Sequence, residues 1–164
     1  MLPEALVLLV CVVGRSDKGA RLAVDESLVQ RGLPELCKLL RSPVSLHREM
    51  VARIPCPLVL HICGDTSDRI AYIRESGMSC FHFDSKVPVA TARKLASERL
   101  ALMGGTSNLT VIRSGDEAAV RADVRAKAAA RIDIIGPECA VPLDAPYRNM
   151  AALTDEVKRL SGSR

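Results

Sequence analysis

Aromatic residues are nearly absent from this 164-residue chain. Tryptophan is missing, and two tyrosines and two phenylalanines bring the aromatic content to 2%. Proteins that bind single-stranded nucleic acid stack the bases on aromatic rings, so this content argues against such a ligand. We expect a core built from Val, Leu, Ile and Ala.

The sequence also lacks a dense block of like charge. Its 23 basic and 19 acidic residues give a formal net charge of +4 and are spread along the chain. A surface that attracts nucleic acid needs clustered charge, so we expect no nucleic-acid partner. With 48% apolar and 26% charged residues, the chain is expected to form one packed core.

No apolar run is long enough to cross a bilayer, which takes about 20 residues. The most apolar stretch, residues 5–13, follows Glu4, where a signal peptide would carry positive charge. We interpret this stretch as a buried strand or as sequence outside the fold, with a secretory signal as the alternative. We expect no membrane association.

The six cysteines are too few, in a chain this apolar, to indicate a disulfide-stapled secreted scaffold. Reduced thiols and a cytoplasmic location are expected. We assign Cys11, Cys37, Cys56 and Cys80 to packing, because a free cysteine on a buried element behaves as a small hydrophobe.

Short apolar runs alternate with helical patterns, which is typical of a parallel α/β protein. Either half of a (β/α)₈ barrel or a small open sheet fits, since a complete barrel takes about 250 residues. We divide the chain into a poorly patterned segment, 1–45, with one possible helix at 33–40, and a structured part, 46–164. The expected strands are 58–62, 79–83, 100–103 and 132–135.

Capping residues mark the expected helix starts. Asp65 and Asp68 are expected to cap the helix after the first of these strands, and Ser114 with Glu117 to form a capping box before a later helix. Pro146 is expected to open the last helix.

Three soft side chains are candidates for a metal site. His61 and Cys63 project from the same face of a strand, because alternate residues of a strand share a face. Cys139 follows the last expected strand. The carboxyl ends of parallel strands meet at one edge, where β/α proteins build their sites. We therefore expect the three residues to face one mouth.

One histidine and two cysteines suit Zn²⁺ and leave one tetrahedral position open. A thiol bound in that position would be held as a thiolate, which is the form that attacks carbon. The chemistry indicated is alkyl transfer to sulfur. A His-x-Cys pair alone is a weak signal, and both cysteines also fit packing roles.

Several motifs follow one another along the structured part of the chain: His61–Thr66, Phe83–Asp84, Leu102–Gly104, Ser114–Gly115, Asp133–Cys139 and Pro146–Asn149. Together they resemble the C-terminal half of the uroporphyrinogen decarboxylase superfamily. Within it, the resemblance is greatest to the cobalamin-dependent zinc methyltransferases of the methylcobamide:coenzyme M type.

The resemblance implies a partial (β/α)₈ TIM-type barrel with parallel strands. It implies zinc held by His61, Cys63 and Cys139, a small thiol substrate, and a methyl group carried on a corrinoid such as methylcobalamin, usually presented by a partner protein. The uroporphyrinogen decarboxylases themselves act in porphyrin biosynthesis and need no metal, and this activity is the alternative.

The N-terminal half of the barrel is not matched by residues 1–45. We interpret the chain as a truncated, rearranged or frame-shifted gene product. A third hypothesis follows: an inactive fragment that serves as an interaction module or self-associates through its open half-barrel.

Other polar residues lie near the expected mouth. Asp84 is our candidate catalytic residue, and it or Asp65 is expected to orient His61, with helix capping as the alternative. His82 and Asp84 form a second, weaker candidate metal pair. Glu138 is interpreted as a fourth ligand or as a solvated loop charge.

Gly104 and Gly105 follow an expected strand, where a glycine-rich turn would let a phosphate approach the backbone. They lack the spacing of a nucleotide-binding loop, so we expect no nucleotide site.

Overall fold

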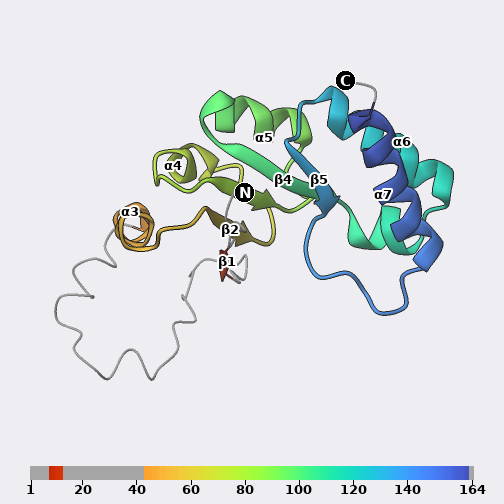
Figure 1. Cartoon of the computed structure of the whole chain (residues 1–164), viewed down its shortest axis with the longest axis horizontal. Coiled ribbons are helices and arrows are strands. Elements are labelled where there is room, and N and C mark those ends of the chain that lie inside the picture. The colour runs from red at the N-terminus through yellow and green to blue at the C-terminus, as the bar shows by residue number, and fades with distance from the viewer. Residues whose placement is uncertain (1–7, 13–42, 163–164) are drawn as a thin grey trace.

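A computed structural model describes residues 8–12 and 43–162 of the chain. Five strands form one sheet in the order β1-β2-β3-β4-β5, and every neighbouring pair is parallel (Figure 1). The strands are β1 (Leu8–Val12), β2 (Leu58–Ile62), β3 (Cys80–Phe83), β4 (Ala101–Thr106) and β5 (Ile134–Pro137).

Helices follow the strands along the chain. In Figure 1, α4 and α5 are neighbours and α5 lies next to β4, while α6 and α7 pack together near β5. The helices are α3 (Pro43–Arg53), α4 (Ile70–Arg74), α5 (Val89–Ala96), the 3₁₀ helix η1 (Ser97–Arg99), the π-helix η2 (Asn108–Arg113), α6 (Glu117–Ala129) and α7 (Tyr147–Ser161).

The strand order separates the two architectures that the sequence left open. A doubly wound sheet reverses its strand order at a switch point, whereas a barrel adds each new strand on the same side. The five strands here follow one another without a reversal. The sheet therefore has the order of part of a β/α barrel.

Alternation along the strands separates the core from the site. Leu58 and Leu60 of β2 and Phe81 and Phe83 of β3 belong to the main hydrophobic core, which packs the helices on the sheet. Because successive side chains of a strand point to opposite faces, His61 lies on the other face. Burial of Leu58 and Leu60 therefore determines which way His61 points.

A second apolar cluster joins α6 and α7 to the rest of the fold. Its buried members are Ile112, Val120, Val124, Ala152 and Leu153. The helical spacing within α6 and α7 places these residues on facing stripes.

The predicted strand in residues 5–13 is confirmed as β1, which pairs in parallel with β2. The possible helix at 33–40 lies outside the described residues. Within the described part of the chain, no helix combines the length and apolar character needed to cross a membrane.

β3, β4 and β5 each begin one or two residues later than predicted, and β4 and β5 also end later. β5 begins two residues later than expected, because the carboxylate of Asp133 accepts the N–H of Leu102 at 2.8 Å and takes the place of a ladder bond. β4 continues through Gly104, Gly105 and Thr106, which pair with β5. Strand ends depend on the neighbouring strand, and local sequence carries little information about it.

The prediction that Ser114 caps the helix in a capping box was wrong. Asp116 is the N-cap of α6, and its carboxylate accepts the N–H of Ala119 at 2.7 Å, while Ser114 ends η2. The predicted caps of α4 were also wrong, because Arg69 occupies the N-cap without a side-chain bond. Asp65 instead accepts the N–H and hydroxyl of Ser67 in a local turn.

A buried carboxylate joins α6 and α7. Glu156 of α7 is 2% exposed and lies 2.9 Å from Arg125, 2.7 Å from Arg159 and 3.5 Å from Arg121. The hydrogen bonds from Arg159 and then Arg125 lower the pKa of Glu156 to about 2. The folded state therefore stabilises the ionised form of this carboxylate.

We expect this carboxylate to make stability depend on acidity. Its folded pKa lies below the ordinary value of 4.5, so its contribution is present above about pH 4.5 and is lost as the pH falls toward about 2. The urea midpoints of the wild type and Glu156→Gln should differ most above pH 4.5 and converge on acidification. A gap that does not change with pH would contradict this expectation.

Candidate metal centre

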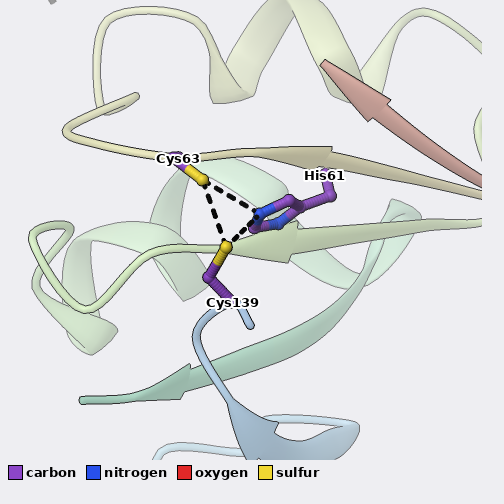
Figure 2. A group of neighbouring side chains, drawn as sticks. All are labelled: His61, Cys63 and Cys139. Atoms are coloured by element: carbon purple, nitrogen blue, oxygen red, sulfur yellow. Dashed lines mark hydrogen bonds between the residues drawn. The ribbon is translucent and has the colours of Figure 1, made fainter. Parts of the chain in front are cut away.

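His61, Cys63 and Cys139 meet at the carboxyl ends of β2 and β5. The Nε2 atom of His61 lies 3.2 Å from Sγ of Cys63 and 3.3 Å from Sγ of Cys139, and the two sulfurs are 3.4 Å apart. Figure 2 shows the three side chains pointing toward one another. They are the only group of three or more potential ligands this close together in the described residues.

The spacing fits a tetrahedral zinc ion. With Zn–S of ~2.3 Å and Zn–N of ~2.0–2.1 Å, neighbouring ligand atoms lie about 3.6–3.8 Å apart. The observed separations are a few tenths of an ångström shorter, so small side-chain shifts would admit the ion. The donor set, one imidazole and two thiols, is also one that zinc prefers.

His61 is held in the tautomer that a ligand requires. Its Nδ1 atom lies 3.1 Å from the backbone carbonyl oxygen of His82, its register partner on β3. Because a carbonyl oxygen only accepts, Nδ1 carries the proton and donates it. The lone pair of the neutral ring is therefore on Nε2, the atom that faces both sulfurs.

Residues 41–160, which make up most of the chain, match the uroporphyrinogen decarboxylase (URO-D) family. The chain belongs to this family.

Its curated relatives include two methyltransferases. The chain is 34% identical over 106 residues to a methylated-thiol–coenzyme M methyltransferase of Methanosarcina mazei, covering 65% of this chain and 29% of that enzyme. It is 25% identical over 96 residues to a methylcobamide:CoM methyltransferase of Methanosarcina barkeri, covering 58% and 28%. The chain thus spans less than a third of the length of these relatives.

A solved structure shows the same fold. A methyltransferase from Methanosarcina mazei superposes with a TM-score of 0.69 at 18% identity, covering 76% of this chain and 37% of that one. This likeness confirms the predicted partial-barrel fold.

The turn after Cys63 is held by Asp84, at the end of β3. Asp84 is 8% exposed, and its carboxylate accepts the N–H of Gly64 at 2.7 Å and of Lys86 at 2.9 Å. We expected Asp84 or Asp65 to orient His61, but the carbonyl of His82 does so. Asp84 acts on the backbone next to Cys63, and Asp65 is occupied by its local turn.

The ring of His82 packs against the site without joining the ligands. Its centroid lies 4.3 Å from that of His61, and its Nε2 donates to the carbonyl of Pro137 at 2.8 Å. Burial is the main factor that lowers the pKa of His82 below 6.5, so the ring is neutral at pH 7. The weaker candidate pair, His82 with Asp84, is therefore not part of the cluster.

Glu138 is neither the fourth ligand nor the solvated loop charge that the sequence suggested. Its carboxylate accepts the N–H of Ser85 at 3.0 Å and the N–H of Asn108 at 2.8 Å. It belongs neither to the ligand cluster nor to a freely solvated loop. Its partners come from the turn after β3 and from the first residue of η2, so its sequence neighbours did not indicate this role.

Two glycines in β4 let this layer pack closely. A Cβ atom on Gly104 would lie 2.4 Å from Cδ2 of His82, and one on Gly105 would lie 2.5 Å from the ring of Phe83. Both glycines have positive φ, 94° and 78°. Their smallness and conformational freedom therefore serve packing beneath the cluster.

The two other cysteines with described side chains lie outside the cluster. Cys80 is buried in β3, and burial raises its pKa to about 11, so it stays a neutral thiol. Cys56 is half-buried against the main core. Both positions fit the predicted packing role, while the side chains of Cys11 and Cys37 lie outside the described residues.

Proposed function

We propose that His61, Cys63 and Cys139 bind a zinc ion, and that the chain takes part in methyl transfer from a corrinoid to a thiol. One observation carries this proposal. Two cysteines that lie 76 residues apart in sequence place their sulfurs 3.4 Å apart, each within 3.3 Å of the same imidazole nitrogen. Packing alone does not require this convergence.

Each protein group has a definite task in this proposal. His61 and the two cysteines supply three ligands, and the described residues add no fourth, so one position is open to a substrate. Zinc bound there would lower the pKa of a coordinated thiol and keep it as the thiolate. The carbonyl of His82 keeps the proton off Nε2 of His61.

Asp84 is proposed as a positioning residue. The sequence suggested a catalytic role, and the carboxylate acts through the N–H of Gly64, the residue after Cys63. By holding this turn, Asp84 fixes the direction in which the Cys63 sulfur projects.

The proposed substrates follow from the relatives. Their names specify a methylated thiol, a methylcobamide and coenzyme M. In the proposed reaction, the sulfur of a small thiol gains the methyl group and loses its proton to solvent. The bond between methyl carbon and cobalt breaks, and its electron pair stays with the corrinoid, which a partner protein would present. A cytoplasmic location suits a site that needs reduced thiols.

Metal analysis and methyl transfer test this proposal together. Purified protein should contain about one zinc per chain. It should also transfer methyl groups from methylcobalamin to a thiol such as coenzyme M or homocysteine, and lose this activity on chelation. A well-folded protein that takes up no zinc would overturn the proposal.

Uroporphyrinogen decarboxylation is the second candidate, because the matching family carries that name. The sequence resemblance implies that this reaction needs no metal. Full decarboxylase activity that survives removal of zinc would favour it.

A third candidate is an interaction module. Within the described residues, β1 and β5 each have only one strand neighbour, so both form edges of the sheet. An unpaired edge is a template for association with another chain. Size-exclusion chromatography that finds a stable monomer would argue against self-association through these edges.

A further inference from the structure

We propose that Glu138 is a positioning residue that holds Cys139 at the metal site. This inference rests on the proposed zinc site and extends it to a side chain outside the ligand set. It follows from four hydrogen bonds around the Cys139 loop.

The first contact ends the sheet. Cys139 lies two residues beyond β5, in a segment without helix or strand. The N–H of Glu138 donates to the carbonyl of Thr106 at 2.9 Å, and this is the last backbone bond from β5 toward β4 before Cys139. Beyond this point, the position of the Cys139 sulfur depends on side-chain contacts.

The carboxylate of Glu138 supplies two of these contacts. One oxygen accepts the N–H of Ser85, after β3, and the other accepts the N–H of Asn108, after β4. The side-chain amide of Asn108 in turn donates to the carbonyl of Ala140 at 2.8 Å. The residues on both sides of Cys139 are therefore tied to the turn after β3 and to the start of η2.

The turn after β3, which contains Ser85, also holds the loop of Cys63. Ser85 follows Asp84, whose carboxylate accepts the N–H of Gly64 beside Cys63. The turn after β3 thus binds the loop of Cys63 through Asp84 and the loop of Cys139 through Glu138. This shared anchor sets the separation between the two sulfurs.

A carboxylate is required because both of its partners are donors. Each oxygen of Glu138 faces one backbone N–H. Glutamine has the same shape but only one acceptor oxygen, so its NH₂ group would face an N–H donor. Glu138→Gln therefore breaks one tie with little change in side-chain volume.

The test compares zinc affinity in three full-length proteins, by competition with a chromophoric chelator. They are the wild type, Glu138→Gln and the matched control Glu156→Gln, which removes a buried carboxylate whose partners are arginines of α6 and α7. Loss of a residue that orients a metal ligand typically lowers affinity roughly 10- to 100-fold. We expect this loss for Glu138→Gln and none for the control.

A second measurement reports on the site without zinc. In metal-free protein, the ratio of alkylation rates at Cys139 and Cys63, read by mass spectrometry, should rise in Glu138→Gln because the Cys139 loop is released. The control should keep the wild-type ratio. If Glu138→Gln does not fold, Glu138→Asp shortens the reach by one methylene and is expected to weaken zinc binding in the same direction.

The outcomes separate the two proposals. Wild-type binding together with unchanged affinity and alkylation in Glu138→Gln would overturn the role of Glu138 and leave the zinc site standing. Failure of the wild type to bind zinc would overturn both. Equal losses in Glu138→Gln and Glu156→Gln would show a general effect on stability and also overturn the positioning role.

Discussion

Cys139→Ser is expected to lose nearly all bound zinc while keeping the fold. The substitution removes one of three soft ligands, and a serine hydroxyl replaces a thiolate poorly. If the ~10–16 kcal/mol of a four-ligand structural site is shared equally, one ligand is worth roughly 100- to 1,000-fold in affinity. The measurements are zinc per chain after gel filtration and the circular dichroism of the same sample.

Cys56→Ala is the matched control for this prediction. It also removes a half-buried thiol, but one that packs against the main core and lies outside the ligand cluster. It should keep the wild-type zinc content, whereas Cys63→Ser should behave like Cys139→Ser. Full zinc content in both ligand variants would exclude the proposed coordination.

Gly104→Ala is expected to destabilise the protein by about 2–5 kcal/mol, from backbone strain and overpacking together. Gly104 has φ of 94°, and an added Cβ would lie 2.4 Å and 2.7 Å from Cδ2 and Nε2 of His82. Both effects act at the layer that supports His61. Urea unfolding of the metal-free variant measures the stability loss, and chelator competition should show weaker zinc binding.

Substitutions at Gly64 and Gly136 separate the contribution of backbone strain from that of overpacking. Gly64 has φ of 89° but no atom within 4 Å of an added Cβ, so Gly64→Ala should show strain alone, about 1–2 kcal/mol. Gly136 has open space and no positive φ, so Gly136→Ala should stay within about 0.5 kcal/mol of the wild type.

A double variant tests the cause of the larger effect. His82→Ala removes the ring that the new methyl group would strike. The loss of stability caused by His82→Ala should therefore be smaller in the Gly104→Ala background than in the wild type. Simple additivity of the two losses would show that His82 is not the source of the clash.

The proposed zinc site is built around the end of β3. The carbonyl of His82 orients His61, its ring contacts Pro137, and the next two residues after Phe83, Asp84 and Ser85, bind the two cysteine loops. β3 supplies none of the three proposed ligands, but its end holds all three in place.

Local patterns predicted most of the strands and helices, and they selected His61, Cys63 and Cys139 as candidate ligands. β2 was predicted with its observed bounds, because an apolar run preceded by prolines depends little on its neighbours. His61 and Cys63 share a face by strand periodicity alone, and Cys139 was placed at the same mouth because carboxyl ends of parallel strands meet at one edge. The residue types themselves indicated zinc and an activated thiol, and the family resemblance added the corrinoid.

The tertiary structure alone decided the supporting contacts. The later start of β5, the orientation of His61 by a carbonyl, the bonds of Glu138 to the turn after β3 and to the start of η2, and the close approach of Gly104 to His82 all join segments far apart in sequence. Residue type and spacing determine which groups are able to bind a metal. Backbone donors from other loops determine where those groups are held, because a loop satisfies its hydrogen bonds with whatever the fold brings beside it.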